Sequence, residues 1–355
     1  MAATAAPAPA ADPALPACGD GPALLASMTT RDKLAQLLMV GVTGAADAKA
    51  VVANHHVGGI FIGSWTDLSM LSDGTLPAIA EAGPLPLAVS VDEEGGRVAR
   101  LASLIGGQPS PRVLAATHTP DEVYKIALDR GEAMRKLGIT IDFAPVVDVT
   151  NAPDDTVIGD RSFGADPTTV TDYAGAYARG LRDAGLLPVL KHFPGHGHGS
   201  GDTHTGSVVT PPLADLQTND LIPYRTLTTQ ASVGVMVGHI QVPGLTGSDP
   251  ASLSPAAYAL LRSGDYGGPP FNGPVFTDDL SSMQAISDRM GVAEAALRGL
   301  QAGADVALWV TTDEVPAVLD RLEKALAAGE LTMPRVDASV LRMAALKGPN
   351  QRCGR

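Results

Sequence analysis

The sequence predicts a closed (β/α)8 barrel that forms a single catalytic domain. Eight apolar runs recur along its 355 residues, and Ala/Leu-rich stretches with helical spacing lie between most of them. Alternating strands and helices give a parallel sheet, and eight such units suit a barrel whose active site lies where the strands end. An open doubly wound sheet is the competing fold, but the Gly-rich phosphate-binding fingerprint is missing after the first strand.

The expected elements follow from these runs. The eight predicted strands are Leu34–Val42, Gly59–Gly63, Pro86–Val91, Ile139–Val146, Leu187–Leu190, Ser232–Val237, Pro274–Thr277 and Asp305–Val310. The clearest predicted helices are Asp121–Leu137, Val170–Ala184, Pro255–Leu261 and Val292–Ala302. Residues 1–22 are almost wholly Ala, Pro, Gly and Asp and cannot bury a core, so we expect a disordered leader there and one domain over 23–355.

Polar side chains stand at the ends of six predicted strands. They are Ser64–Trp65, Asp92–Arg97, Asp148, Lys191–His192, His239 and Asp278–Asp279. A single acidic residue in such a place is often a helix N-cap, which is the interpretation we favour for Asp121 and Asp279. Stability alone does not account for all six, because buried ion pairs stabilise a fold poorly. The strand ends therefore predict a catalytic mouth.

The segment 191–205, KHFPGHGHGSGDTHT, is the most polar of these ends. It carries a lysine, four histidines and an aspartate among glycines, directly after an apolar strand pattern. A flexible His-rich surface loop is the alternative. Because catalytic side chains concentrate in loops after buried strands, the pattern favours a catalytic loop.

Composition excludes several classes of partner. The net charge of −13 argues against nucleic acid, which requires a basic surface. No apolar run reaches the roughly 18 residues of a membrane span, so no transmembrane segment is expected. The two cysteines, Cys18 and Cys353, lie at opposite ends of the chain. Since the first and last barrel elements are neighbours, they can pair in an oxidising, extracytoplasmic compartment; two unpaired thiols in the cytoplasm are the alternative.

Four motifs carry a resemblance to a known family: VDEEGGRVAR (91–100), GDRSFG (159–164), KHFPGHG (191–197) followed by DTH (202–204), and VFTDDLSSM (275–283). In this order the chain resembles the single-domain bacterial β-N-acetylglucosaminidases of glycoside hydrolase family 3, from Arg31 to about Leu346. The resemblance implies a barrel that removes terminal N-acetylglucosamine with retention of configuration, often from peptidoglycan fragments. It implies no cofactor and no metal.

The catalytic residues implied by the resemblance fit the chemistry. Asp278 would be the nucleophile that forms a glycosyl-enzyme. The acid/base role falls to Asp202 and His204, and a carboxylate beside an imidazole favours the imidazolium that protonates a leaving oxygen. Asp279 is expected to cap a helix or to act as a supporting hydrogen-bond partner. The loop glycines, Gly195 to Gly201, would let the loop swing, with His204 in place only when it closes.

The remaining strand-end residues are candidates for binding sugar. Asp92 would accept hydrogen bonds from the outer hydroxyls, while Arg161, Lys191 and His192 would donate to hydroxyls or the acetamido group. His239 is expected either to contact sugar or to satisfy a buried neighbour. Structural roles are expected for three others: Arg97 would tether its own loop, and His196 and His198 would shape theirs.

Other functions stay open at this point. A metal hydrolase could use His192, His196, His198, Asp202 and His204, although they lack the helical spacing of a zincin. A non-catalytic sugar-binding barrel is a second alternative. Within the family, β-glucosidases usually carry a further C-terminal domain, and phosphorolysis is open because a histidine acid/base does not repel phosphate. The expected partner is an N-acetylglucosamine-containing oligosaccharide or muropeptide, bound by a monomer.

Overall fold

The computed structural model describes residues 21–230 and 232–347. The expected leader lies almost entirely outside these residues, although Gly21 and Pro22 begin helix α1 (Gly21–Ala26). Cys18 and Cys353 lie outside them as well, so their pairing stays a prediction.

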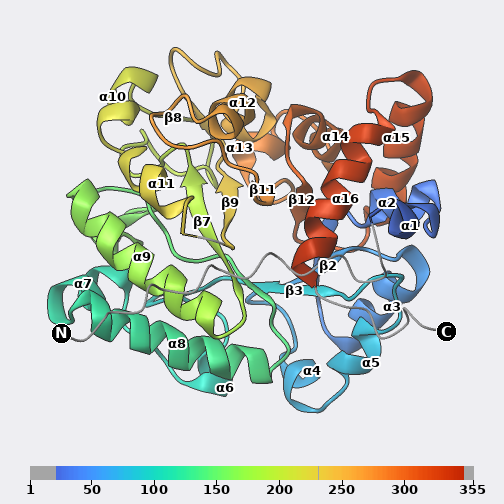
Figure 1. Cartoon of the computed structure of the whole chain (residues 1–355), viewed down its shortest axis with the longest axis horizontal. Coiled ribbons are helices and arrows are strands. Elements are labelled where there is room, and N and C mark those ends of the chain that lie inside the picture. The colour runs from blue at the N-terminus through green and yellow to red at the C-terminus, as the bar shows by residue number, and fades with distance from the viewer. Residues whose placement is uncertain (1–20, 231, 348–355) are drawn as a thin grey trace, which may run out of the picture.

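Eight parallel strands close into a barrel (Figure 1), which confirms the predicted fold. Around the barrel the order is β1-β12-β11-β9-β7-β6-β3-β2, with β1 paired to both β2 and β12. The barrel strands are β1 Leu38–Val42, β2 Gly59–Ile62, β3 Ala88–Val91, β6 Ile141–Asp142, β7 Leu187–Phe193, β9 Gly234–Val237, β11 Val275–Asp279 and β12 Val306–Trp309.

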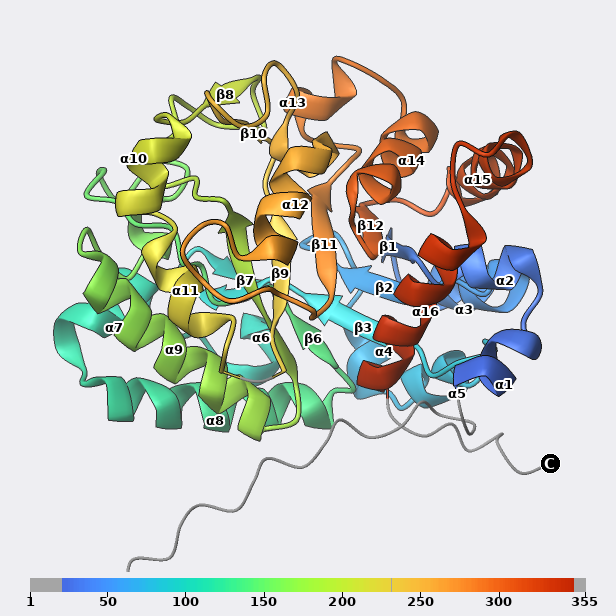
Figure 2. The ribbon, with the colours of Figure 1, turned by 45° about the horizontal axis from the view of Figure 1, so that its top comes forward.

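Helices surround these strands (Figure 2). Besides α1 they are α2 Thr30–Ala35, α3 Ala45–His55, α4 Ser69–Ser72, α5 Leu76–Ala80, α6 Ala102–Ile105, α7 Pro111–Thr117, α8 Pro120–Lys136, α9 Pro167–Asp183, α10 Leu213–Thr218, α11 Ile222–Leu227, α12 Pro255–Ser263, α13 Gln284–Ser287, α14 Val292–Ala302, α15 Val315–Ala328 and α16 Met333–Lys347. Two 3₁₀ turns span Gly159–Arg161 and Ala251–Leu253. No described helix is both long and apolar enough to span a membrane.

The strands are buried on both faces, as parallel strands between a core and a helix layer must be. Alternate residues point inward and form one cluster, in which Phe143 and Phe276 meet edge to face at 5.5 Å. The outward residues pack under the helices in a second, larger cluster. Burial of these two apolar layers holds the barrel together.

Three predicted boundaries shift for physical reasons. Leu34 and Ala35 end helix α2, so the first strand begins only at Leu38. The fourth strand keeps regular pairing only over Ile141–Asp142, and beyond it Pro145 has no N–H to donate to a ladder. Strand β7 extends beyond Leu190 to Phe193, because its charged residues find partners inside the barrel mouth, as described below.

One helix cap also differs from expectation. Asp121 does not cap α8; Thr119 does, through a capping box in which it accepts from the N–H of Glu122 while Glu122 accepts from the N–H of Thr119. Asp121 lies in the first turn, where its negative charge interacts favourably with the helix dipole.

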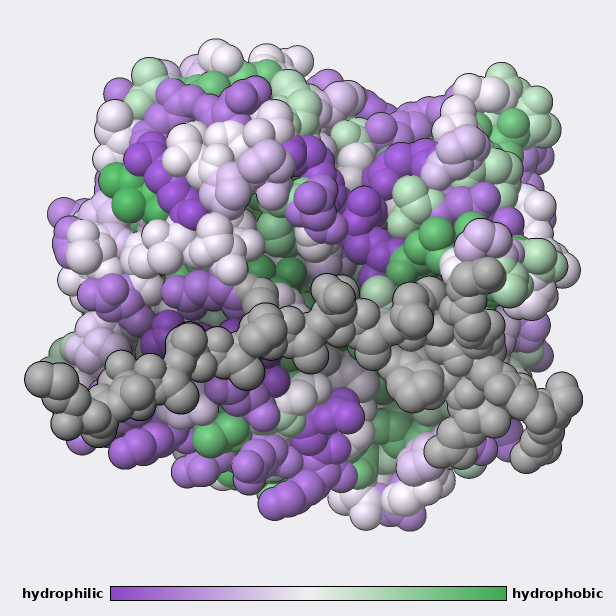
Figure 3. Space-filling model, in the orientation of Figure 1, coloured by the Kyte–Doolittle hydropathy of each residue, from purple (hydrophilic) through white to green (hydrophobic). Residues whose placement is uncertain are grey.

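Two short pairs of strands lie outside the barrel. Strands β4 (Glu93–Gly95) and β5 (Val98–Ala99) form an antiparallel hairpin directly after β3, and β8 (Val208–Val209) pairs with β10 (Ile240–Gln241). Both follow carboxyl ends of barrel strands, and Glu94 and Val98 of the first hairpin line the cavity described below. On the face seen in Figure 3, outside the grey atoms, hydrophilic side chains predominate and hydrophobic ones form small separate groups.

Candidate active site

A cavity of about 240 Å³ opens at the carboxyl ends of the barrel strands. Its floor is apolar, because Phe61, Met236 and Leu308 belong to both the cavity wall and the inward-facing barrel core. Six of the eight predicted site residues line it: Asp92, Arg161, Lys191, His192, His204 and Asp278. Asp202 lies in an adjoining cavity, and His239 lines neither.

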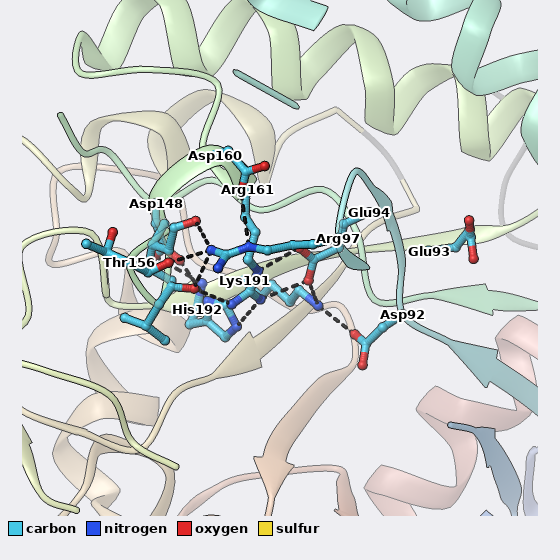
Figure 4. Close-up of polar contacts among 12 residues, drawn as sticks. Asp92, Glu93, Glu94, Arg97, Asp148, Thr156, Asp160, Arg161, Lys191 and His192 are labelled. Atoms are coloured by element: carbon cyan, nitrogen blue, oxygen red, sulfur yellow. Dashed lines mark hydrogen bonds and ion pairs between the residues drawn. The ribbon is translucent and has the colours of Figure 1, made fainter. Parts of the chain in front are cut away.

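A buried group of four charges forms one wall (Figure 4). Lys191, on β7, places its Nζ 2.6 Å from an Asp92 oxygen and 2.6 Å from a Glu94 oxygen. Arg161 binds the same Glu94 through two nitrogens, at 2.8 and 2.9 Å. Two positive and two negative charges therefore balance within the wall. We call Asp92, Glu94, Arg161 and Lys191 the charge quartet.

These contacts shift the pKa values of Glu94 and Lys191. Burial alone would raise the pKa of Glu94, but the charges of Arg161 and Lys191 outweigh it and hold the pKa far below its ordinary range. The pKa of Lys191 is raised because Asp92 and Glu94 outweigh its own burial. Glu94 and Lys191 are therefore charged at neutral pH, and the quartet offers polar atoms to a sugar hydroxyl.

Glu94 is a site residue to which the sequence reasoning gave no role. Residues 92 and 94 stand on one side of the extended chain and residue 93 on the other. Glu93 accordingly points away in Figure 4 and pairs with the buried Arg130 and the N–H of Leu101. The two-residue period was the signal that could have found Glu94.

Asp148 is the second residue whose role was missed. It lies fully buried, and one oxygen is 2.7 Å from Nδ1 of His192 while the other accepts from the backbone N–H of His196 at 2.8 Å. Nε2 of His192 lies 3.5 Å from Arg161, and Nδ1 faces the Asp148 carboxylate. Asp148 thereby fixes the orientation of the His192 ring.

His196 is buried, and neither ring nitrogen has a partner among the described residues. Its ring stands edge-on to His192 at 5.8 Å and lies between the two cavities. Burial, followed by the nearby His192, lowers its pKa, so it is neutral at pH 7. His198 takes a structural position, 3.0 Å from Asp220.

Asp278 is the penultimate residue of β11, and its side chain lines the cavity. Burial would raise its pKa, but His239, His192 and the backbone N–H of Asp279 together lower it. The carboxylate is therefore ionised at neutral pH, as a nucleophile must be.

Asp279 and His239 support this strand end. Asp279 accepts from the N–H and hydroxyl groups of both Ser281 and Ser282, which matches the expected supporting role. His239 donates from Nε2 to the carbonyl of Asp279 at 2.6 Å, and its Nδ1 lies 2.6 Å from the Ser252 hydroxyl oxygen. With both nitrogens used and 1% of its surface exposed, His239 satisfies buried neighbours, the second of its two expected roles.

Asp202 and His204 form a pair on the loop after β7. One Asp202 oxygen lies 2.7 Å from Nδ1 of His204 and 2.9 Å from its backbone N–H. Burial opposes the shift, yet these hydrogen bonds lower the pKa of Asp202. The His204 side chain is 57% exposed and reaches the cavity wall. Between the two, the carbonyl of the buried Thr203 accepts from the N–H of Ala285, which ties the pair to helix α13, the helix that follows β11.

The expected swinging loop is more restricted than the glycine content indicated. A Cβ on Gly197 would lie 2.0 Å from the carbonyl oxygen of Val149, and one on Gly195 would lie 2.5 Å from Asp220. These glycines therefore allow close packing against the barrel. A Cβ on Gly201 would meet only a Val208 methyl, at 4.0 Å, and one on Gly206 would meet nothing within 4 Å, so close packing is absent only in that part of the loop.

Arg97 ties a neighbouring loop rather than its own. It pairs with Asp160 at 3.0 Å and donates to the carbonyls of Thr156 and Ile158. Within 21–230 and 232–347, no group of three or more His, Cys, Asp or Glu side chains is placed to hold a metal ion.

Comparisons with known proteins agree with this geometry. Residues 29–346 match the glycosyl hydrolase family 3 N-terminal domain. The chain is 70% identical over 349 residues to the β-hexosaminidase LpqI of Mycobacterium tuberculosis, covering 98% of this chain and 90% of that protein. The chain therefore belongs to glycosyl hydrolase family 3, which confirms that it is a glycoside hydrolase.

Solved structures show the same fold. The crystal structure of a family 3 glycosyl hydrolase from Mycobacterium smegmatis is 76% identical and superposes with a TM-score of 0.91, covering 92% of this chain and 99% of that one. A family 3 β-N-acetylglucosaminidase from Paenibacillus is 34% identical with a TM-score of 0.84, over 90% of this chain and 62% of that one.

Proposed function

We propose that this glycoside hydrolase is an exo-acting, retaining β-N-acetylhexosaminidase that releases terminal N-acetylglucosamine from β-linked glycans. The observation that carries the proposal is a single cavity with an ionised carboxylate, Asp278, the His204 side chain of a carboxylate–imidazole pair and an opposite wall of fixed charges. Relatives named β-hexosaminidase and β-N-acetylglucosaminidase support it.

The first step would form a covalent glycosyl-enzyme. Asp278 attacks the anomeric carbon as the glycosidic bond breaks, and protonated His204 delivers a proton to the departing oxygen. Asp202 holds Nδ1 of His204, leaving Nε2 to carry the transferred proton. The resulting ester links Asp278 to the sugar in the opposite anomeric configuration.

The second step would hydrolyse the glycosyl-enzyme and regenerate the free enzyme. Neutral His204 takes a proton from water as the water oxygen attacks the anomeric carbon, and the ester bond to Asp278 breaks. Two inversions give retention of configuration. The hydrogen bond between Thr203 and Ala285 supports these two roles, because it links the acid/base loop to helix α13, which follows the strand of the nucleophile.

The terminal sugar would lie on the apolar floor with its outer hydroxyls against the charge quartet. In the closed barrel β3 and β11 lie on opposite sides, and this separation supports a sugar ring bound between Asp92 and Asp278. Peptidoglycan fragments are the proposed natural substrates. A monomer acting outside the cytoplasm completes the proposal, the location resting on the two terminal cysteines.

Product analysis with a chromogenic β-N-acetylglucosaminide, in phosphate-free and in phosphate buffer, tests the activity beside the matching β-glucoside. We expect release of β-N-acetylglucosamine in both buffers and little cleavage of the glucoside. Preference for the glucoside would contradict the substrate, and N-acetylglucosamine 1-phosphate as the main product would replace hydrolysis by phosphorolysis.

The nucleophile has its own test. A slow fluorinated substrate should label Asp278, as read by peptide mass spectrometry, and Asp278→Asn should abolish turnover while the melting temperature stays close to that of the unsubstituted protein. An adduct on Asp279, or an Asn variant with a near-normal rate, would show that the nucleophile lies elsewhere.

A further inference from the structure

A second cavity, of about 340 Å³, adjoins the catalytic cavity between the segment 152–158 and the loop 196–202. We call it the loop cavity. Three residues line both cavities and so form the partition between them: Val157, Ile158 and His196. The loop cavity has room for several water molecules. The partition therefore stands between a space that can hold water and the space in which the sugar reacts.

His196 is the member of the partition whose side chain can form hydrogen bonds. The side chains of Val157 and Ile158 are apolar, and their carbonyls accept hydrogen bonds from arginine side chains. Neither ring nitrogen of His196 has a partner in the described part of the chain, although only 3% of the residue is exposed. A neutral imidazole carries one donor and one acceptor, and burying both without partners is costly. A molecule that enters the cavities is therefore expected to bind this ring.

The backbone fixes His196 while leaving space beside its ring. Its N–H donates to Asp148 at 2.8 Å, and its carbonyl accepts from the N–H of Gly199 at 2.9 Å. Gly199 lines the loop cavity, and a Cβ at this position would lie 3.3 Å from Nδ1 of His196. Glycine therefore keeps a side chain away from Nδ1 on the side of the loop cavity. In the catalytic cavity the ring stands edge-on to His192, at 5.8 Å.

The acid/base pair spans the same two cavities. Asp202 lines the loop cavity, and its partner His204, at 2.7 Å, lines the catalytic cavity. In a retaining hydrolase the water attacks on the face that the leaving group has left, where the acid/base stands. Water from the loop cavity would reach the sugar beside this pair without passing the site of the leaving group.

We propose that the loop cavity holds the water for the second step and that His196 binds this water and positions it for attack on the glycosyl-enzyme. The inference rests on the proposed function, because it needs the ester at Asp278. The water oxygen bonds to the anomeric carbon, its proton moves to Nε2 of His204, and the bond from that carbon to Asp278 breaks. His196 orients the water and keeps its own proton.

Two substitutions separate hydrogen bonding at His196 from the size of its ring. His196→Phe keeps a ring without nitrogens, and His196→Gln keeps a donor and an acceptor. On an activated aryl N-acetylglucosaminide the first step is fast, so kcat reports the second step and kcat/KM the first. We expect His196→Phe to lower kcat about tenfold, as the loss of one hydrogen bond to the water allows, with KM falling in proportion. His196→Gln should restore most of kcat, and the smaller His196→Leu should behave like His196→Phe.

An alcohol gives the second measurement, because it competes with water for the glycosyl-enzyme. Propanol is larger than water and takes the place of the departed leaving group, so it enters by the mouth of the catalytic cavity. The measured quantity is the product ratio of propyl β-N-acetylglucosaminide to free N-acetylglucosamine. His196→Phe should raise this ratio by a similar factor, because only the supply of water is reduced. His204→Ala should leave the ratio unchanged, because the same imidazole deprotonates both acceptors.

His198→Gln is the matched control. It removes an imidazole from the same loop, but His198 pairs with Asp220 at 3.0 Å and lines neither cavity, so kcat, kcat/KM and the product ratio should keep their unsubstituted values. Two results for His196→Phe would overturn the proposal. A fall in kcat/KM with an unchanged kcat would mean that His196 binds the terminal sugar. An unchanged product ratio would mean that His196 only supports the loop. Failure of the proposed function itself looks different, because the unsubstituted protein would then neither cleave the aryl glycoside nor form an adduct on Asp278.

Discussion

Glu94→Gln tests the central ion pairing of the active-site wall. Glu94 is 2% exposed and is the partner shared by Arg161 and Lys191, so the neutral amide leaves two buried cations facing one carboxylate, Asp92. Removing one partner of a buried pair costs about 3–5 kcal/mol of unfolding free energy. The isosteric amide preserves the volume, so cavity formation does not contribute.

The free energy converts to a melting temperature. Unfolding entropy near the midpoint is about 2.1 cal/mol/K per residue, or about 0.7 kcal/mol/K for a domain of about 330 residues. A loss of about 3–5 kcal/mol therefore lowers the melting temperature by about 4–7 °C. Differential scanning calorimetry at pH 7 measures it. The control is Asp154→Asn, which removes a carboxylate 73% exposed in its pair with Arg112 and should cost less than about 1 kcal/mol.

The pH dependence gives a second measurement on the same variant. The pKa of Glu94 is lower in the folded protein than its ordinary value of 4.5. Its ion pairs therefore contribute stability above that value, and the contribution is lost as the pH falls towards the folded pKa. Glu94→Gln should flatten the decline of stability below pH 4.5. A shift under about 1 °C at pH 7 together with an unchanged acid profile would refute the reasoning, because the pairs would then contribute nothing.

Two further predictions concern the loop after β7. His204→Ala should lower kcat/KM by about 10²–10⁴-fold on natural glycosides. On an activated aryl glycoside the first step should slow far less, which gives a burst followed by slow turnover, and Asp202→Asn should have a milder effect. Equal loss of activity on both substrates without a burst would mean that His204 only positions the loop. Gly197→Ala should destabilise the fold by about 1–3 kcal/mol or more, because the new methyl group would clash with the Val149 carbonyl. Gly201→Ala is the control and should be close to neutral when both variants are unfolded in urea. Equal urea midpoints for the two variants would show that the base of the loop is not packed as described.

The sequence by itself determined the barrel and the location of its mouth. Apolar runs at regular intervals predicted the eight strands in the right order, because burial on both faces of a parallel strand requires continuous apolar residues. The polar residues that end those runs marked the mouth, and six of the eight predicted site residues do line the cavity there. The family was likewise predicted from the sequence, because local motifs identify it.

Only the tertiary structure decided how the charges are paired. Lys191 meets Asp92 across 99 residues of chain and Arg161 meets Glu94 across 67, so no local pattern specified these partners. The two-residue period of an extended chain places Glu94 and Glu93 on opposite sides of the hairpin. Only the folded structure shows that the Glu94 side faces the active site and that Glu93 pairs with Arg130. The loop glycines show the same limit: sequence permits freedom, whereas the packing of Gly197 against Val149 removes it, because close approach of two backbones depends on segments distant in the chain.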